Sequence, residues 1–561
     1  MPETSKSRYQ RFKLIAAFLT VGIISLVQPG CDCSSSNGGI GTAPPSAITT
    51  VSPLSNSVTS LVTTDVSAVF LDEMDGATVI NAFTLTLNNT PVPATVTYDV
   101  ITKTTVLTPL ADLISNTEYR ATIASSVKDI NGNSPLSADY IWSFKTGSSI
   151  QLVSKNTSGV TSNDLSWNSD IDATGRYIVF ESEATNLSSV ATTLNRQHIY
   201  RKDTVTGEVV LVSSDASGLV EANTQASNPS ISSSGRYVVF NSTATNLDAA
   251  INSNGISQVY LKDMDDGSID LVSRSATLAP DNSAGASFAK VSDDGLRIVF
   301  QSPDNNLSLI DGGGISQIYL KNMSDESVQM ISRSATNIAG NNASNNPDMS
   351  TDGKYIVFES SASNLTTSNG VNHIYFVDTS ATTHTIEQIS LSSAGLEATA
   401  PCNRPSVSDD GSMVVFDTND ILDSFDNNGT TDVYFRYRPL VFTKLVSVNP
   451  DTSNSGNGAS SNASISGNAN YVAFESLASD LVTGGVLGVK DIFVRDLSAL
   501  PLTVIDRVNN PESGGEATSH SISPAISKDG RYVSFHSIVP FTLDDTDTRF
   551  DVFRTHNSTF Q

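Results

Sequence analysis

Short apolar runs bounded by turn residues recur along most of this chain of 561 residues. In "SSSGRYVVFNSTATNL" (232–247), a Gly turn leads into the apolar run 237–240, and small polar residues follow. At 95–98 apolar and polar residues alternate, which sends side chains to opposite faces of a strand. Outside the N-terminus no window sustains an apolar period of 3.6 residues, so the pattern predicts an all-β protein.

The stretch at 232–247 belongs to a repeat. The aromatic residue that ends its apolar run recurs at intervals of 60, 60, 58, 58, 58 and 61 residues, a period typical of propellers and other arrays. Each copy contains a Ser/Asn-rich strand, a Gly turn, the apolar strand, a variable loop, a strand carrying Tyr or Phe, and a final strand similar to "LVS". Four strands per copy predict one propeller blade each. The recurring aromatic residues are Phe180, Phe240, Phe300, Phe358, Phe416, Phe474 and Phe535.

The final strand of each copy is out of step with the other three. Its first example, at 152–154, precedes every other repeat strand, whereas the last copy ends at 551–556 with no such strand after it. Pairing 150–154 with the last copy would complete that blade and remove an open sheet edge. The sequence therefore predicts seven blades over 149–561, closed by this N-terminal strand.

The repeat resembles the TolB-type propeller repeat, a WD-like repeat of bacterial periplasmic and surface proteins. The stretches that carry the likeness are 174–187, 232–247, 350–365 and 527–537. The resemblance implies a propeller fold and allows several functions, since such propellers include protein and peptide scaffolds, glycan binders and some enzyme domains.

Residues 48–148 form a separate set of short strands about the size of one sandwich domain. The stretches "FLDEMD" (70–75), "VTYD" (96–99) and "WSFKTG" (142–147) resemble a bacterial Ig-like domain, as do 107–123 and 127–133. There are no paired cysteines of the antibody type. The resemblance implies a spacer outside the cytoplasm.

The N-terminus has the three parts of a secretory signal. Basic residues at 6–13 precede the apolar run 14–27, which is too short for a typical membrane span. We therefore predict a signal peptide over 1–30, followed by a flexible tether over 31–47. Gly30-Cys31 resembles a lipoprotein cleavage site, which implies a lipid anchor on Cys31 and a place in the cell envelope, periplasmic or surface-exposed. Ordinary secretion is the alternative if Cys31 is not lipidated.

Charge narrows the class of partner. The chain has 32 Lys and Arg against 58 Asp and Glu, a net charge of −26, and its basic residues form no stripe after the first 13 positions. Nucleic acid is therefore not an expected partner. A solvated acidic surface accounts for the negative charge.

Catalytic motifs are absent from the sequence. The six His residues form no HxH, HExxH or Cys/His cluster, and no GxSxG or P-loop occurs. His198 and His373 occupy equivalent repeat positions where other copies carry Gln or Asp, which indicates a polar blade position. Cys402 has no adjacent base and is expected to be a structural thiol.

Two acidic loops suggest a metal. Blade five carries Asp426, Asn428 and Asp432, and blade seven carries Asp544, Asp545, Asp547 and Asp551. Hard cations such as Ca²⁺ take several oxygen ligands from short loops of this kind. Asx turns would explain the same residues without metal. Calcium is thus the one possible cofactor; no other is expected.

The sequence favours a non-catalytic, monomeric, exported and lipid-anchored protein that binds a protein, peptide or glycan of the cell envelope through its propeller. The alternatives are an envelope hydrolase or polysaccharide lyase built on the same ring, and a purely structural surface protein. The lining of the central channel distinguishes these classes: Ser, Asn and Ala favour a scaffold, whereas clustered carboxylates, His and Arg favour an enzyme.

Overall fold

The computed structural model describes residues 47–57, 65–110, 113, 117–146, 150–193, 196–248, 255–275, 284–482, 485–486, 488–498, 502–510, 519–542, 544–557 and 559. The predicted signal peptide, Cys31 and nearly all of the predicted tether lie outside these residues. The described part is almost entirely β-structure, in nine four-stranded sheets, so the all-β prediction is confirmed.

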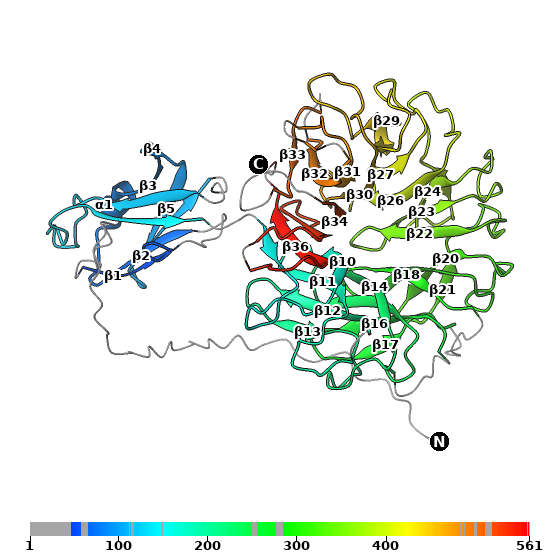
Figure 1. Cartoon of the computed structure of the whole chain (residues 1–561), viewed down its shortest axis with the longest axis horizontal. Coiled ribbons are helices and arrows are strands. Elements are labelled where there is room, and N and C mark those ends of the chain that lie inside the picture. The colour runs from blue at the N-terminus through cyan, green and yellow to red at the C-terminus, as the bar shows by residue number, and fades with distance from the viewer. Residues whose placement is uncertain are drawn as a thin grey trace.

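The N-terminal domain packs two four-stranded sheets face to face (Figure 1). Its core is apolar and centres on Trp142, which is 1% exposed and whose indole N–H donates to Pro53 O at 3.1 Å. One sheet has the order β1 (Ile48–Ser52), β2 (Val66–Phe70), β6 (Thr104–Pro109) and β5 (Ala94–Asp99); the other has β4 (Thr90–Pro91), β3 (Phe83–Leu87), β7 (Glu118–Ile123) and β8 (Tyr140–Lys145).

A short helix in this domain was not expected from the sequence. Helix α1 (Gly76–Ala82) begins after Asp75, whose carboxylate accepts the Ala77 N–H at 3.0 Å and caps the first turn. Seven residues are too few to show a clear helical period. The propeller adds one 3₁₀ turn, η1 (Arg438–Leu440).

The repeat forms seven antiparallel sheets of four strands each, and each sheet is one blade. Blade one comprises β10 (Ser166–Ile171), β11 (Tyr177–Ser182), β12 (His198–Asp203) and β13 (Val209–Leu211). Blades two to four comprise β14 (Ala226–Ile231), β15 (Tyr237–Ser242), β16 (Gln258–Asp263), β17 (Ile269–Leu271); β18 (Ser287–Val291), β19 (Arg297–Ser302), β20 (Gln317–Asn322), β21 (Val328–Met330); and β22 (Ser344–Met349), β23 (Tyr355–Ser360), β24 (His373–Asp378), β25 (Ile386–Gln388). Blades five to seven comprise β26 (Cys402–Val407), β27 (Met413–Thr418), β28 (Asp432–Tyr437), β29 (Phe442–Leu445); β30 (Ser460–Ile465), β31 (Tyr471–Ser476), β32 (Asp491–Asp496), β33 (Ile505–Arg507); and β34 (Ser521–Ile526), β35 (Tyr532–Ser537), β36 (Asp551–His556), β9 (Gln151–Leu152).

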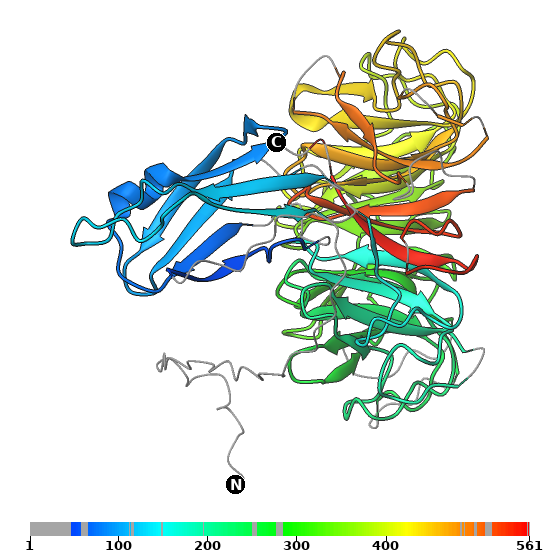
Figure 2. The same cartoon turned by 60° about the vertical axis from the view of Figure 1, so that its left-hand side comes forward.

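The blades are arranged around a centre. The innermost strand of each blade contacts that of the next, and β10 contacts both β14 and β34. Blade one, in cyan, therefore lies beside blade seven, in red, in both views (Figures 1 and 2). The fourth strand of blade seven is β9, with Leu152 opposite Phe553 and Gln151 opposite Arg554. This is the pairing that the out-of-step final strand predicted.

Each blade packs its aromatic residues in the same way. The Phe of the second strand stacks on the Tyr or Phe of the third, as with Phe240 and Tyr260, whose ring centroids are 5.9 Å apart. The Tyr260 hydroxyl donates to Ala244 O at 3.1 Å. The apolar clusters also join neighbouring blades: Val179 of blade one packs with Val238 of blade two. One repeat alone could not bury these faces.

The repeated Gly-x-Tyr motif forms a contact between consecutive blades. The turn glycine has positive φ, and it lies directly against the first residue of the second strand in the preceding blade. A Cβ on Gly411 would lie 2.7 Å from Tyr355 Cγ, closer than real Cβ contacts. The pairs are Gly175 with Tyr532, Gly235 with Tyr177, Gly295 with Tyr237, Gly353 with Arg297, Gly411 with Tyr355 and Gly530 with Tyr471.

Blade six has an alanine in place of the turn glycine. Its glycine, Gly467, is not the equivalent residue: Ala469 occupies the left-handed turn position with φ 62° and donates its N–H to Ser466 O, as Gly235 does to Ser232 O. Blade five begins its second strand with Met413 in place of Tyr, and Ala469 packs against the apolar cluster that contains Met413. Alanine thus stands here where the facing side chain is flexible rather than aromatic.

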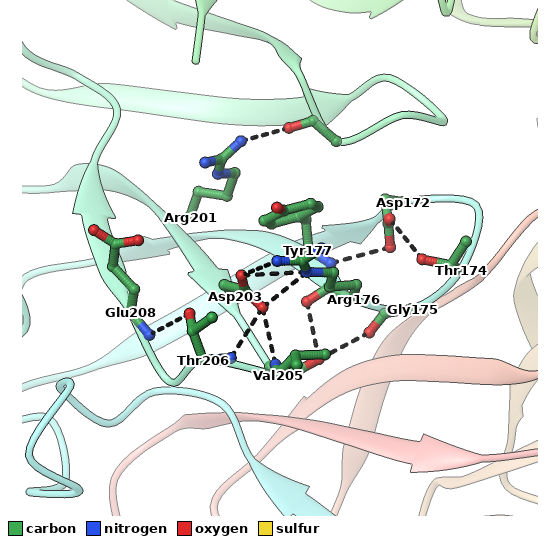
Figure 3. Close-up of polar contacts among 12 residues, drawn as sticks. Asp172, Thr174, Gly175, Arg176, Tyr177, Arg201, Asp203, Val205, Thr206 and Glu208 are labelled. Carbon is green, nitrogen blue, oxygen red and sulfur yellow. Dashed lines mark hydrogen bonds and ion pairs between the residues drawn. The ribbon is translucent and has the colours of Figure 1, made fainter. Parts of the chain in front are cut away.

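A charged pair in blade one joins the turn before β11 to the end of β12 (Figure 3). Arg176 donates from Nε and Nη2 to the carboxylate of Asp203, with the shortest contact at 2.7 Å, and Asp203 also accepts the Val205 N–H at 2.9 Å. Burial opposes ionisation of Asp203, but the Arg176 guanidinium prevails and lowers the pKa of Asp203 to about 2. Arg236 and Asp263 repeat the pair in blade two at 2.6 Å.

Among the described residues, no helix is both long and apolar enough to cross a membrane.

Candidate functional site

The centre of the propeller is a cavity of about 350 Å³. Residues from the innermost strands of all seven blades and from the turns after them line it. Most of these residues are Ser, Asn, Pro or small apolar residues, so the wall offers many hydrogen-bonding groups and few charges. The charged residues of the lining are Asp170, Lys290, Asp348, Arg404 and Lys528.

Every innermost strand contains a bulge that faces this channel. In each blade the register with the second strand shifts, and one residue adopts a left-handed conformation with φ between 47° and 54°. Asn tolerates this conformation better than most residues and fills four of the seven positions. The bulge interrupts the hydrogen-bond ladder with the second strand, so backbone groups of the bulge residue are not paired within it. The seven residues are Asn168, Asn228, Phe288, Asn346, Arg404, Asn462 and Ser523.

A ring of polar side chains from the second strands holds the bulges in place. The residue after the repeat Phe accepts the backbone N–H of the bulge residue in the next blade. Glu181 accepts that of Asn228 at 2.7 Å, and Glu359 accepts that of Arg404 at 2.9 Å. Gln301, Asp417, Glu475 and His536 bind Asn346, Asn462, Ser523 and Asn168 in the same way. We call these six residues the acceptor ring.

Five of the six acceptor-ring residues are buried, and Gln301 is partly buried. Burial raises the pKa of Glu181, Glu359 and Asp417. Burial lowers the pKa of His536 to about 4, so this ring member is neutral at pH 7. Each member accepts a backbone N–H from a bulge residue of the next blade. The sequence analysis did not single out these residues, although a polar residue directly after the Phe in all seven copies was a visible signal.

The two carboxylates in the channel lining are also held by backbone groups. Asp170 Oδ2 accepts from Ser230 Oγ at 2.8 Å and from Ile231 N at 3.2 Å, and Lys290 Nζ lies 3.5 Å away. Asp348 Oδ2 accepts from Val407 N at 3.0 Å. The lining residues in the described part of the chain include no His or Cys. The channel wall is therefore largely polar, with Ser and Asn as its most frequent polar residues and with five charged residues.

The structure brings together the acidic residues predicted in the blade-seven loop. Ligand oxygens of Asp545, Asp547 and Asp551 lie within 4.8 Å of one another. Asp544 instead binds Lys155, at 2.7 Å. Burial, with the charge of Asp551, raises the pKa of Asp545 to about 7, and burial raises that of Asp551 to about 6.

In blade five, Asp426 and Asp432 are both buried. Asp426 accepts from the Tyr434 hydroxyl, and Asn428 accepts the Thr430 N–H at 2.7 Å. Burial raises the pKa of Asp432 to about 8. Asx turns are present in both loops, as the alternative interpretation expected; the Asp547 carboxylate, for example, accepts the Arg549 N–H at 2.8 Å.

The remaining candidate residues are structural. Cys402 is fully buried and burial raises the pKa of its thiol to about 12, as expected for an inert cysteine. His198 and His373 are buried at the first residue of the third strand in their blades, where each ring nitrogen Nδ1 contacts a Ser hydroxyl.

Together the fold and the channel define an Ig-like domain followed by a ring-shaped propeller with a polar central cavity. Residues 41–146 match the family model described as bacterial Ig-like domain, which confirms the prediction for the N-terminal domain. No curated protein matches the chain.

Three solved structures are similar in fold. The putative TolB from Agrobacterium tumefaciens is 18% identical, with 51% of this chain and 82% of that chain covered and a TM-score of 0.33. TolB from Acinetobacter baumannii is 18% identical, with 59% and 60% covered and a TM-score of 0.32, so the match spans less than two thirds of that protein. The β-propeller domain of the Trilobed protease from Pyrococcus furiosus is 9% identical, with 71% and 98% covered and a TM-score of 0.40. The propeller assignment itself rests on the sheet order and the contacts between blades.

Proposed function

We propose that this chain is an exported binding protein of the bacterial cell envelope, in which the propeller binds a peptide segment or a glycan at its central channel. The Ig-like domain acts as a spacer between the propeller and a lipid anchor on Cys31. The protein acts as a monomer and carries out no chemistry on its ligand.

The channel wall is the observation that carries this proposal. The innermost strands of all seven blades line a cavity of about 350 Å³ with many Ser and Asn side chains, and this volume suits a small part of a larger ligand. The acceptor ring fixes six of the seven bulges before any ligand arrives, and such preorganisation lowers the entropic cost of binding. The channel carboxylates are occupied by backbone N–H groups, which favours recognition over catalysis.

Two further features support a location in the envelope. The first 30 residues have the layout of a signal peptide that ends before Cys31. The N-terminal domain matches a bacterial Ig-like family, whose resemblance implied a spacer outside the cytoplasm.

A blocked channel tests the proposal. Lys290 lines the channel and its side chain is 38% exposed, so Lys290→Trp would fill the cavity without burying a new charge. Leu219→Trp, on a turn where Leu219 is 76% exposed, is the matched control. Envelope proteins and glycans captured by cross-linking to the unmodified chain are identified, purified and titrated against both variants by calorimetry.

We expect Lys290→Trp to weaken binding of the ligand at least about tenfold, a loss of about 1.4 kcal/mol, while Leu219→Trp binds normally. Equal binding by the two variants would place the ligand elsewhere and refute the channel as the site. Hydrolysis or cleavage of a captured glycan or peptide would refute the non-catalytic proposal.

A further inference from the structure

The first residue of the third strand occupies an equivalent buried position in every blade, which we call the entry position. It is at most 3% exposed in all seven blades. The residues are His198, Gln258, Gln317, His373, Asp432, Asp491 and Asp551. The sequence varies here between neutral and acidic side chains, so each blade must satisfy a different buried polar group.

One end of the entry side chain is satisfied in the same way throughout. In six blades it binds the hydroxyl of the Ser that lies two residues after the fourth strand, and in blade six Asn509 takes the place of that Ser. The same Ser accepts the N–H of the residue after the entry position, as Ser154 does from Val552 at 3.0 Å. This half of the arrangement belongs to the fold.

The other end of the side chain differs among the blades, and six of the seven form two groups. His198 Nε2 lies 2.9 Å from Glu221, and His373 Nε2 lies 2.8 Å from Asn369 Oδ1. In blade three the Gln317 amide donates to Gly340 O at 2.8 Å, and in blade six Arg507 lies 3.4 Å from Asp491. These four blades therefore have a described polar partner at both ends of the entry side chain.

In blades five and seven the second carboxylate oxygen is left over. Asp432 Oδ2 and Asp551 Oδ2 are buried, and neither makes a hydrogen bond with any described residue. One carboxylate oxygen of Asp551 lies within 4.8 Å of carboxylate oxygens of Asp545 and Asp547. A buried anion beside two further anions is costly unless a cation joins them.

The two loops share one spacing. Asp545, Asp547 and Asp551 repeat the intervals of Asp426, Asn428 and Asp432, with the third residue at the entry position in both blades. Two positively charged side chains lie near this loop, and each already binds an Asp: Arg549 binds Asp547 at 2.9 Å, and Lys155 binds Asp544.

We propose that the blade-seven loop holds one Ca²⁺ ion between the carboxylates of Asp545, Asp547 and Asp551, and that this ion stabilises the junction between strand β9 and strand β36. We call this junction the seam. All three side chains offer oxygen, which Ca²⁺ prefers and which does not select Zn²⁺. The blade-five loop, with one Asn in place of Asp, is a weaker site for the same ion.

The role at the seam is inferred from the residues that Asp551 contacts. Its Oδ1 accepts from Ser154 Oγ at 2.5 Å and from Ser162 Oγ at 2.9 Å, and both serines lie at the N-terminal end of the propeller. Asp544 O accepts from Thr161 Oγ1 at 2.9 Å. Strand β9 adds only two residues to the ladder. An ion on Asp551 would therefore strengthen the junction between the two ends of the domain.

Calcium titration of the purified chain by calorimetry in 0.15 M salt tests the site. Asp547→Asn is the main variant, because Asp547 is 33% exposed in its side chain and an Asn keeps the turn with Arg549. Asp551→Asn is the second variant. Asp491→Asn is the matched control, since it changes the same entry position in a blade without an acidic loop. Hydrogen exchange of 150–162 with and without Ca²⁺ reports on the seam.

We expect Ca²⁺ to bind the unmodified chain and slow exchange in 150–162, and we expect the Asp491→Asn control to behave alike. Asp547→Asn and Asp551→Asn should each weaken the tighter binding event at least about tenfold and abolish the slowing. Absence of binding, or binding unchanged in both variants because Ca²⁺ collects on the acidic surface, would overturn the site. Binding without slower exchange in 150–162 would overturn its role at the seam.

Discussion

The contact between turn glycine and aromatic residue predicts a specific penalty for Gly411→Ala. Gly411 has φ 65°, and a Cβ there would lie 2.7 to 2.9 Å from three atoms of the Tyr355 ring. Left-handed backbone costs a residue with Cβ about 1–2 kcal/mol, and forcing the ring aside adds about 1–3 kcal/mol of overpacking. The free energy of unfolding should therefore fall by about 2–5 kcal/mol.

A second glycine isolates the two contributions. Gly395 has φ 76°, but its Cβ would meet nothing within 4 Å. Gly395→Ala should lower the free energy of unfolding by about 1–2 kcal/mol, because only the left-handed backbone conformation is unfavourable for the new residue. The change in unfolded-chain entropy is the same for both substitutions and cancels in the comparison.

The chain itself supplies the rescue. At the junction between blades five and six, Ala469 packs against the apolar cluster that contains Met413, so Gly411→Ala combined with Tyr355→Met imitates a natural arrangement. Relative to Tyr355→Met alone, Gly411→Ala should then cost no more than Gly395→Ala, giving a coupling energy of about 1–3 kcal/mol.

Urea unfolding followed by circular dichroism measures these differences, provided that the denaturant slope is unchanged among the variants. Equal costs for Gly411→Ala and Gly395→Ala would refute the argument. So would a penalty at Gly411 that persists in the Tyr355→Met background, because the ring would then not be its cause.

Three further outcomes follow from single buried groups. Tyr260→Phe should lower the free energy of unfolding by about 0.5–1.5 kcal/mol in urea titration, since it removes the buried hydrogen bond from this hydroxyl to Ala244 O; a stability unchanged to within error would contradict the role of this hydroxyl. His536→Asn should flatten the stability profile between pH 6.5 and 4. Burial lowers the pKa of this histidine from 6.5 to about 4, and the charge of Glu475 opposes this shift. As the pH falls, the unfolded chain therefore takes up a proton before the folded chain does, and the free energy of unfolding falls by roughly 3 kcal/mol. A profile of the variant parallel to that of the unmodified chain would exclude this contribution. Leu152→Ala should cost about 2–5 kcal/mol in thermal or urea unfolding, because Leu152 is 3% exposed within the core of blade seven, whereas a cost below about 0.5 kcal/mol would show that β9 is not part of that core.

Repetition made the strand order predictable from the sequence. Seven copies of one pattern revealed the four strands, and the misplaced "LVS" strand at 152–154 revealed its partner at the other end of the chain. The acidic loops were also visible, since charged residues stand out in a chain where only 16% are charged.

What the sequence could not convey was contact between blades. The tight approach of Gly411 to Tyr355 and the bond from Glu359 to Arg404 N join residues of different repeats, so no local pattern predicts them. The equivalence of Ala469 to the turn glycines was likewise hidden, because the nearby Gly467 matched the expected residue type. The unpaired oxygen of Asp551 depended on knowing which donors surround it in three dimensions.

The pairing of β9 with β36 has a consequence for how the domain reaches its native state. Leu152 and Phe553 are neighbours in one sheet although they lie 401 residues apart in the chain (553 − 152). Contacts between such distant residues form slowly, because a long loop must first be closed. Blades one to six can each assemble from consecutive residues, but the last sheet must wait until residues 551–556 are available. An emerging polypeptide thus carries the exposed edges of an open ring until its final segment arrives, and this interval is when it is most vulnerable to aggregation and proteolysis.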